Sequence, residues 1–515
     1  MLNPANTILE MKGISKFFDG KPANDQIDLK VNEGEIVALL GENGAGKSTL
    51  MNILFGLYQA DHGEISIDGK VVSINSPLDA IALGIGMVHQ HFMLIPAFDA
   101  YENIALSISG KRNGLVNHQV IREQIKKHSI QYNLSIVLDT IVQDLPVGLQ
   151  QQVEILKALF GECRILVLDE PTGVLNEQEK IKLFSSLKEL KAAGLSIIFI
   201  SHKLDEVLDI SDRVVILRKG KVVDSVTTNR TNKEDLACRM VGRDVVFSVK
   251  KGPRLFDNKM KDRVLEIKNI EVHGKRNTQT IKDLSLTIHR GELFGIAGVD
   301  GNGQSELVEA LAGLRHVTKG KIFLNGNEIT NRSSRSIKQM GLAFVPEDRR
   351  SMGTIASYSL DQNIFFRNSD SKTFRKHFGQ IDKKKLHMLG DRLIKDYDIR
   401  IPHRDMLVGQ LSGGNIQKVI LAREISSDPV VLVAMHPTRG LDVGAIEFIH
   451  TRLLELLSSG AGILLISTEL DEIISLSDQM AVISNGKLSR PFRPDELSLS
   501  QIGLLMGGSD EEACR

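Results

Sequence analysis

Hydrophobic residues along the chain fall into short apolar runs of strand length. The N-terminal half contains, in order, TILEMKGI, EGEIVALLG, RILVLD and SIIFIS, and the C-terminal half contains RVLEIKNI, RGELFGIAG, VVLVAM and GILLIS. Stretches between these runs, such as EKIKLFSSLKELKAAG, have the periodicity of helices. Strands that alternate with helices predict an α/β fold in which a mainly parallel sheet is covered on both faces.

Two further segments of each half add detail to this prediction. The alternating residues at the start of each half predict an antiparallel β edge. Residues 95–160 and 352–425 have mostly helical patterns and are predicted to form a helical subdomain in each half.

The two halves repeat one another in register. Equivalent residues up to Glu347 are separated by a constant number of residues, as in the pair Gly46 and Gly303. From Gly414 onward the separation is nine residues longer. The matched residues keep the same order in both halves, and their separation changes only once. This pattern predicts a tandem duplication of a whole domain, because chance matches do not keep a constant offset.

The length of 515 residues fits two domains, since single hydrophobic cores stop growing near ~250–300 residues. The segment FSVKKGPRLFDNKMKD is polar, basic and rich in turn-forming residues, which is typical of a linker. We therefore expect one domain over residues 7–246, a linker over 247–262 and a second domain over 263–510.

Composition narrows the function. Lys and Arg together number 64, as do Asp and Glu, so the chain has no net positive charge that would attract nucleic acid. No nucleic-acid partner is therefore expected. The cysteines Cys163, Cys238 and Cys514 fit neither a disulfide framework nor metal-ligand spacing, which indicates a reducing compartment. The first residues lack the pattern of a secretion signal, and the apolar runs are shorter than the ~20 residues of a membrane span.

The segment GENGAGKST follows an apolar strand and precedes a helix. In this context the glycines let backbone amides turn inward, and the loop and the helix N-terminus cradle the phosphates of a nucleotide. Lys47 adds a positive charge, and Ser48 places its hydroxyl on the Mg²⁺ that bridges the phosphates. A glycine turn with an incidental lysine is the structural alternative. The loop residues are Gly41, Glu42, Asn43, Gly44, Ala45, Gly46, Lys47, Ser48 and Thr49.

Polar residues at the ends of other apolar runs suit the same chemistry. Asp169 is suited to hold Mg²⁺, and Glu170 to deprotonate or orient the attacking water. Gln90 can contact the metal or the water, and His202 can donate to the γ-phosphate. A solvated acidic pair is the alternative for the two acids, and ordinary polar residues at strand ends are the alternative for Gln90 and His202.

Taken together, these residues resemble the ATP-binding cassette (ABC) ATPases over nearly the whole chain. In that family's terms the glycine loop is similar to Walker A, ILVLDE to Walker B, Gln90 to the Q-loop and His202 to the switch histidine. The resemblance implies two tandem P-loop NTPase domains that bind ATP and Mg²⁺ and hydrolyse ATP. Phe18 resembles the aromatic residue that stacks on adenine. Phe17 in that role, or a core role for either phenylalanine, remains open.

The segment LSGGN at 411–415 resembles the signature of the family. The resemblance implies that two cassettes meet head to tail and that this signature completes the ATP site of the other half. The equivalent LPVGL has Pro146 and Val147, which remove a hydroxyl and an amide donor and add bulk. Asp442 is implied to reach the first site and Asn176 the second. The signature residues assigned to ATP binding are Ser412, Gly413, Gly414 and Asn415.

The second glycine loop, GVDGNGQSE at 298–306, lacks the lysine. The positions of the lysine, metal acid, base and switch histidine are occupied there by Gln304, Met435, His436 and Thr468. An amide cannot offset phosphate charge, and a thioether cannot hold Mg²⁺. We therefore predict one competent composite site and one degenerate site that binds nucleotide weakly or statically and hydrolyses it very slowly.

The segments GVDGNGQSE, VPEDRR and HPTRGLDVGA resemble the energy subunits of bacterial importers for simple sugars and nucleosides, and residues 86–104 favour the nucleoside branch. The resemblance implies two membrane permease subunits and an extracytoplasmic solute-binding protein or lipoprotein as partners. It also implies a peripheral position at the cytoplasmic face of the inner membrane. A soluble two-cassette translation factor acting on the ribosome is the alternative function, and a nucleotide-gated regulator is a third.

Overall fold

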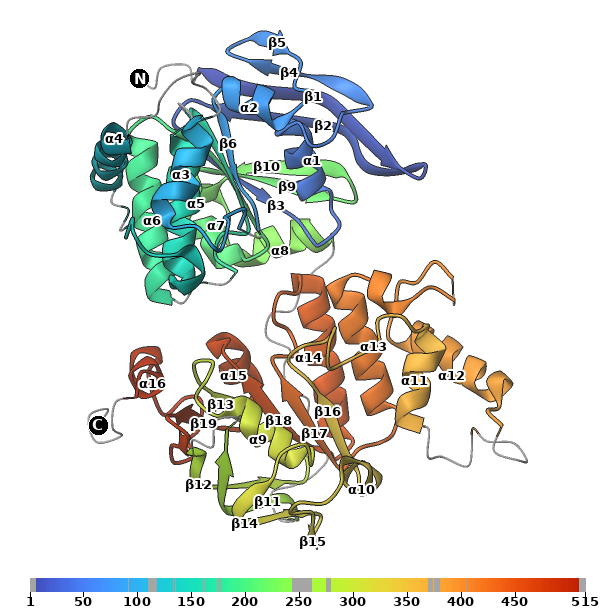
Figure 1. Cartoon of the computed structure of the whole chain (residues 1–515). Coiled ribbons are helices and arrows are strands. Elements are labelled where there is room, and N and C mark those ends of the chain that lie inside the picture. Colours follow the sequence, from blue (N-terminus) through green and yellow to red (C-terminus); the bar gives the residue numbers. More distant parts are fainter. Residues whose placement is uncertain are drawn as a thin grey trace. The chain divides into compact units, whose positions relative to one another are not determined.

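The computed structural model describes residues 6–90, 92–109, 118–132, 134, 136–160, 163–173, 175, 177–242, 262–274, 279–368, 374, 380–403 and 405–508. The chain divides into two compact units near residue 245, and each unit is described by itself (Figure 1). The predicted linker lies outside the described residues except for Asp262. The boundaries 7–246 and 263–510 therefore remain predictions.

A six-stranded sheet of order β10-β9-β3-β8-β7-β6 forms the centre of the first unit. Neighbouring strands are parallel except β10, which is antiparallel to β9. Every residue of β3 and β7 is buried, because other elements cover both faces, and these strands are therefore continuously apolar in sequence. The strands are β3 (Ile36–Leu40), β6 (Ile85–Val88), β7 (Ile165–Asp169), β8 (Ser196–Ser201), β9 (Arg213–Arg218) and β10 (Lys221–Thr227).

The alternating N-terminal segment lies in a separate antiparallel sheet of order β2-β1-β4-β5. Its strands are β1 (Thr7–Phe18), β2 (Lys21–Asn32), β4 (His62–Ile67) and β5 (Lys70–Val72). Leu9 and Met11 of β1 are fully buried, whereas Lys12 is exposed, so one face of this sheet packs on the core and the other faces solvent.

The helices of the first unit cover the central sheet. They are α1 (Lys47–Leu54), α2 (Pro77–Ala82), α3 (Ala100–Ser109), α4 (His118–Gln131), α5 (Val147–Leu159), α6 (Glu177–Ala192), α7 (Leu204–Ile210) and α8 (Lys233–Val241), with 3₁₀ turns at Val142–Asp144 and Thr228–Arg230. Helices α3 and α4 both pack against α5, which in turn packs against β6. The predicted helical subdomain is therefore confirmed in the first unit.

The second unit repeats this architecture. Its sheets have the orders β16-β17-β18-β13-β19-β20 and β12-β11-β14-β15, which match the first unit strand for strand. The strands are β11 (Arg263–His273), β12 (Gln279–His289), β13 (Leu293–Ala297), β14 (Val317–Leu324), β15 (Asn327–Glu328), β16 (Leu342–Val345), β17 (Val431–Met435), β18 (Gly462–Ser467), β19 (Gln479–Ser484) and β20 (Lys487–Leu488). The predicted duplication is confirmed.

The helices of the second unit follow the same order along the chain. They are α9 (Gln304–Leu311), α10 (Ser334–Gln339), α11 (Leu360–Asn368), α12 (Lys383–Asp396), α13 (Gly413–Ile425), α14 (Val443–Ser458), α15 (Leu470–Leu476) and α16 (Leu499–Met506), with a 3₁₀ turn at Val408–Gln410. Helix α11 packs against both α12 and α13, and these three helices form the predicted helical subdomain of this unit.

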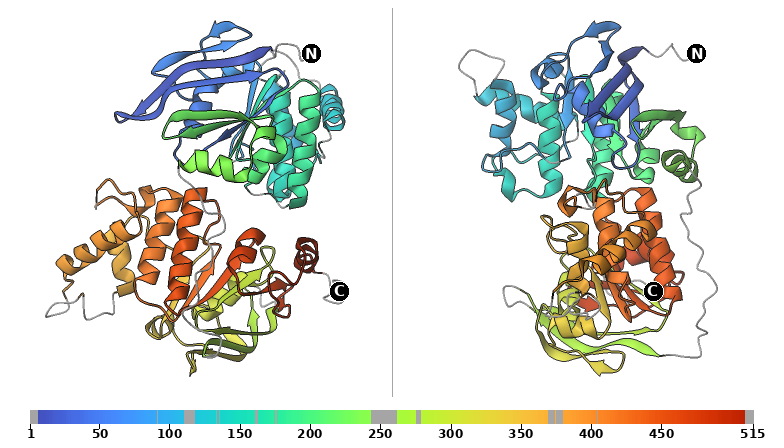
Figure 2. Two further views of the ribbon diagram at one scale, coloured as in Figure 1. Left: turned by 180° about the vertical axis from the view of Figure 1, so that it is seen from behind. Right: turned by 90° about the vertical axis from the view of Figure 1, so that its right-hand side faces the viewer.

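Alternate residues of the central strands belong to two different cores. In β7, Ile165 and Val167 pack into the core shared with the antiparallel sheet and α1, whereas Leu166 and Leu168 pack into the core of the helical side. Figure 2 shows the central sheet of each unit between these two layers. Packing on both faces holds the carboxyl ends of the strands in place, and ligand sites of open α/β sheets lie there.

Among the helices in the described parts of the chain, none combines the length and the apolar character needed to cross a membrane.

Candidate active site

The first glycine loop connects β3 to α1, as predicted. Gly46 lies immediately before α1 with a φ of 102°, in the left-handed region that favours glycine. A Cβ atom on Gly46 would lie 2.4 Å from the carbonyl oxygen of Ala23 and 2.6 Å from Nδ2 of Asn24. Asn24 also donates a hydrogen bond to the Gly46 carbonyl at 3.1 Å. The loop therefore packs closely against β2, and only glycine fits at this position.

This close packing leads to a test of the loop. Gly46→Ala is expected to lower the melting temperature of the first unit and to weaken binding of a fluorescent ATP analogue. The matched control is Gly194→Ala. Gly194 has a similar φ of 95°, but open space surrounds its Cβ position. Both changes force an L-residue into the left-handed region at a cost of roughly 1–2 kcal/mol, and only Gly46→Ala adds a clash with β2. Equal melting temperatures and equal analogue affinities in the two variants would contradict this account.

Lys47 extends into the loop that precedes it. The residue is only 5% exposed. Its Nζ donates hydrogen bonds to the carbonyl oxygens of Gly41 at 2.7 Å and Glu42 at 3.1 Å. Burial lowers the pKa of Lys47, and the charges of Glu170 and Asp169 oppose this shift. The structure thus places an ammonium group inside the loop, close to two carboxylates.

Asp169 is the last residue of β7 and is buried. Burial, followed by the neighbouring charge of Glu170, raises its pKa, and a hydrogen bond with Ser48 opposes the shift. Two adjacent acids in a poorly solvated position are stabilised by a cation. The Ser48 hydroxyl and the Asp169 carboxylate are oxygen ligands of the type that Mg²⁺ prefers, and they lie within hydrogen-bonding distance of each other. These residues therefore fit Mg²⁺.

Glu170 directly follows β7, and two side chains hold its carboxylate. Gln90 Nε2 donates to Oε2 at 3.0 Å, and His202 Nδ1 lies 2.9 Å from Oε1. Burial acts to raise the pKa of Glu170, but the hydrogen bond and charge of His202, together with the charge of Lys47, outweigh it and lower the pKa. The structure therefore brings the three predicted catalytic residues together from the ends of three strands.

The backbone at Glu170 is unusual. Its φ is 47°, in the left-handed region that non-glycine residues seldom adopt. Such strain persists only where the surrounding fold maintains it, and it occurs often at active sites. The turn directs the carboxylate back toward Gln90 and His202.

Phe18 ends β1 and is 43% exposed, and Phe17 is also exposed. Either ring is therefore accessible to a ligand, and the alternative that they form part of the core is wrong. The Phe18 ring makes an edge contact with Tyr58 at a centroid distance of 5.5 Å, and Lys16 Nζ lies 5.8 Å from its centre. Sequence reasoning missed Tyr58, because it lies in the loop after α1 and no pattern connects it to β1.

The second glycine loop connects β13 to α9 and has the same backbone form. Gly301 and Gly303 have φ values of 90° and 108°, close to 82° and 102° at their counterparts in the first loop. Gln304 is buried, and both the nitrogen and the oxygen of its side-chain amide form hydrogen bonds with the loop backbone. Its Nε2 donates to the Val299 carbonyl at 2.8 Å, and its Oε1 accepts from the Asn302 amide at 3.0 Å. A neutral group therefore takes the place of the Lys47 ammonium.

Met435 ends β17, and the buried His436 follows it with a φ of 45°, close to that of Glu170. Burial lowers the pKa of His436, although the charges of Glu347 and Asp300 oppose this shift. The ring is therefore neutral at neutral pH. The backbone amide of Thr468 donates to its Nδ1 at 3.3 Å.

The predicted signature begins helix α13 in the second unit. Ser412 is the N-cap, and its Oγ accepts hydrogen bonds from the Asn415 amide at 3.4 Å and from Asn415 Nδ2 at 3.0 Å. Gly413 and Gly414 form the first turn. The equivalent helix α5 of the first unit has Pro146 at its N-cap, without a hydrogen bond from the side chain. Asn176, which is expected to reach the second site, lies outside the described residues.

A family model described as ABC transporter matches residues 24–173 and 281–439, which together make up more than half of the chain. The chain belongs to the ABC transporter family. This ABC transporter chain is 45% identical over 505 residues to the guanosine import ATP-binding protein NupO of Bacillus subtilis (strain 168), with 98% of each chain covered. It is 42% identical over 504 residues to the nucleoside import ATP-binding protein NupA of Lactococcus lactis subsp. cremoris (strain MG1363), with 98% of this chain and 99% of the relative covered.

Among solved structures, this ABC transporter chain resembles the archaeal ribosome recycling factor aABCE1, from a crystal structure of its complex with the ribosomal stalk protein aP1. The TM-score is 0.63 at 20% sequence identity, with 96% of this chain and 92% of that chain covered. At this identity the likeness shows a shared fold alone. As a member of the ABC transporter family with two matched cassettes, the chain is an ATP-binding ATPase.

Proposed function

We propose that this ATPase is the energy-coupling subunit of an importer for nucleosides or simple sugars. Its partners are two membrane permease subunits and an extracytoplasmic solute-binding protein or lipoprotein, and it lies peripherally at the cytoplasmic face of the inner membrane. The observation that carries the proposal is the similarity of the whole chain to proteins named for import of guanosine, nucleosides and, in Clostridium tetani (strain Massachusetts / E88), ribose, the last at 38% identity over 502 residues.

The first unit provides the hydrolytic residues in this proposal. Lys47 stabilises the β- and γ-phosphates of ATP, and the loop amides bind their oxygens. Ser48 and Asp169, with Gln90, would hold Mg²⁺, which would supply positive charge to offset that of the phosphates. The residues of the glycine loop and Phe18 hold the nucleotide, with Phe18 stacking on the base.

Glu170 acts as the general base in the proposed reaction. Its carboxylate takes a proton from a water molecule as the water oxygen attacks the γ-phosphorus, and the bond to the β-phosphate oxygen breaks to release ADP and phosphate. The lowered pKa keeps the carboxylate ionised, so it is in the form that can accept a proton. Gln90 and His202 hold it in position by the hydrogen bonds described above. His202 can also donate to the γ-phosphate.

The second glycine loop is proposed to belong to a degenerate site. Gln304 carries no charge and uses both ends of its amide on the loop backbone. Met435 stands where the first unit has Asp169, and a thioether is a poor ligand for Mg²⁺. In addition, the carboxylates of Asp300 and Glu347 lie near His436. The signature residues Ser412–Asn415 are proposed to complete the first site.

The proposal is tested by purifying the untruncated chain from its native cells in mild detergent and identifying the proteins that accompany it. Recovery of two polytopic permeases with a solute-binding protein is the expected result, and a purification from cells that lack the chain is the control. Recovery of ribosomal proteins without permeases would overturn the proposal and favour a translation factor. The likeness to a ribosome recycling factor at 20% identity is one of fold alone, whereas the import proteins are 42–45% identical to this chain.

A further inference from the structure

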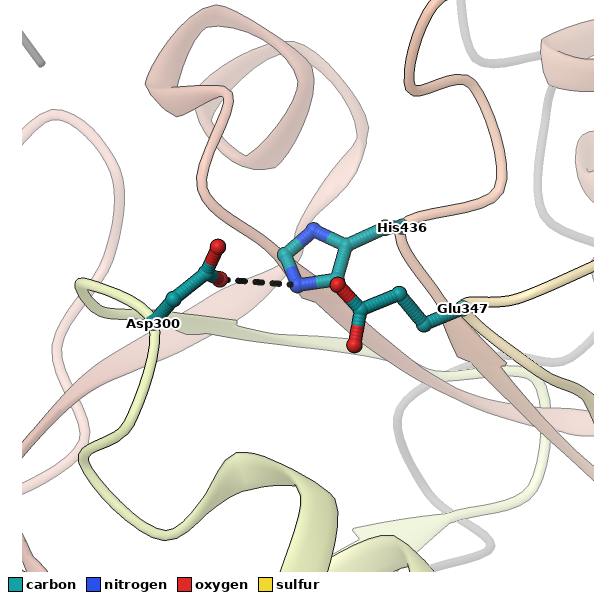
Figure 3. Close-up of side chains that lie close together, drawn as sticks. All are labelled: Asp300, Glu347 and His436. Atoms are coloured by element: carbon teal, nitrogen blue, oxygen red, sulfur yellow. Dashed lines mark ion pairs between the residues drawn. The ribbon is translucent and has the colours of Figure 1, made fainter. Parts of the chain in front are cut away.

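Two carboxylates and one imidazole converge beside the second glycine loop. The ligand atoms of Asp300, Glu347 and His436 all lie within 4.8 Å of one another. Asp300 lies in the loop after β13, Glu347 follows β16 and His436 follows β17, so three strand ends contribute one side chain each (Figure 3). All three belong to the second unit.

His436 indicates that this cluster lacks a ligand. The residue is only 4% exposed, and its Nε2 has no hydrogen-bond partner among the residues that the structure describes. Nε2 lies 3.6 Å from Oδ1 of Asp300, beyond hydrogen-bonding distance. Figure 3 shows this nitrogen facing the carboxylate of Asp300, with the carboxylate of Glu347 beside the ring. Buried polar atoms are normally satisfied, so this atom requires a partner at that point.

We propose that Asp300, Glu347 and His436 form a binding site for a divalent transition-metal ion of the zinc type. Imidazole nitrogen and carboxylate oxygen are both zinc ligands, whereas Mg²⁺ and Ca²⁺ favour oxygen ligands alone. Three protein ligands leave a coordination position open to water or to a phosphate oxygen. The site is independent of the import function proposed above.

The geometry requires only small movements. A tetrahedral ion with bonds of about 2.0–2.1 Å holds its ligand atoms about 3.4 Å apart. In the structure, the ligand atoms of the three residues lie up to 4.8 Å apart, so they must move closer together. The Asp300 side chain is about half exposed and that of Glu347 about one third, so both can rotate toward the fixed imidazole. The carboxylates therefore close on a metal that His436 holds.

Two existing contacts oppose the metal. Arg439 Nη1 lies 3.2 Å from Oδ2 of Asp300 and 2.7 Å from Oε1 of Glu347, so its guanidinium offsets one of the two negative charges. The Arg439 side chain is 44% exposed, and exposed ion pairs of this kind contribute little stability. Metal binding at Nε2 also places the ring proton on Nδ1, which breaks the long hydrogen bond from Thr468. Arg439 and the metal compete for the same two carboxylates.

The test measures Zn²⁺ binding to the full-length, untagged chain by competition with a chromogenic chelator, without nucleotide because ATP binds metals itself. His436→Asn, Asp300→Asn and Glu347→Gln are each expected to weaken one Zn²⁺ site at least ~10-fold. Asp300 and Glu347 are exposed, so these two variants keep the fold even if His436→Asn does not. His316→Asn, at an exposed histidine of the same unit, is the matched control and should leave the affinity unchanged.

Arg439→Gln provides a test in the opposite direction. Removal of the competing guanidinium is expected to tighten Zn²⁺ binding about tenfold, because the two carboxylates are left without their cation. Excess Mg²⁺ should not displace the bound Zn²⁺. Equal Zn²⁺ stoichiometry and affinity in the wild-type chain and in the Asp300→Asn and Glu347→Gln variants would overturn the proposal, as would displacement by Mg²⁺.

Discussion

Glu170→Gln is expected to reduce ATP turnover about 100-fold or more and to leave nucleotide affinity nearly unchanged. Glutamine preserves the size of the side chain and can still hydrogen-bond Gln90 and His202, which hold the carboxylate at 3.0 Å and 2.9 Å. It cannot accept the proton of the attacking water. Steady-state phosphate release by the full chain, with ATP affinity measured in parallel, separates the loss of the base from a loss of binding.

Two controls accompany this experiment. Glu64→Gln removes an exposed carboxylate on β4 of the same unit and should retain wild-type turnover. His202→Ala and Thr468→Ala form a pair at equivalent positions of the two units, and only the first is expected to lose activity, at least ~10-fold. Comparable losses from His202→Ala and Thr468→Ala would mean that both halves hydrolyse ATP, and the model of one competent site would be wrong.

Ser412→Arg, a change in the second unit, is expected to reduce turnover at the first glycine loop by about 100-fold. Ser412 is exposed at the N-terminus of α13, where backbone amides and the helix dipole favour an anion. In the proposed head-to-tail pairing, these amides face the γ-phosphate held by Lys47. An arginine there adds bulk at the contact and removes the N-cap. Phosphate release by the full chain is the measurement.

Ser333→Arg is the matched control for this change. Ser333 is likewise an exposed serine at a helix N-cap in the second unit, and its side chain accepts a hydrogen bond from the Ser336 amide. Both substitutions therefore lose a cap, at a typical cost of about 1 kcal/mol. Only Ser412→Arg changes the signature. Wild-type turnover in Ser412→Arg would refute the pairing between halves, and equal losses in both variants would attribute the effect to general destabilisation.

Sequence patterns predicted the fold well because its main signals are local. Continuous apolar runs such as RILVLD are the direct result of burial on both sheet faces, and the constant offset between the halves predicted the repeated strand order. Strand, glycine loop and helix are contiguous, so the location of Lys47 could also be predicted. The carboxyl ends of parallel strands lie together, which explains why Gln90, Glu170 and His202 were expected at one site.

Contacts between distant segments could not be predicted in this way. The edge contact of Tyr58 with Phe18, the packing of Gly46 against β2 and the bridge from Arg439 to Asp300 and Glu347 each depend on tertiary structure. The hydrogen bonds of Gln304 are a further example. The sequence indicated that a positive charge is lost at this position. It did not indicate that both the nitrogen and the oxygen of the Gln304 side chain form hydrogen bonds with the loop backbone.

The left-handed backbone shared by Glu170 and His436, with φ values of 47° and 45°, has a consequence for how a repeated domain changes over time. The turn is retained in the second unit although its side chain is an imidazole rather than a carboxylate. The main-chain framework therefore does not depend on the reactive group that it presents. A duplicated catalytic domain can therefore lose its activity through changes in a few side chains while its backbone stays the same. Few codon changes would then be needed to restore the activity.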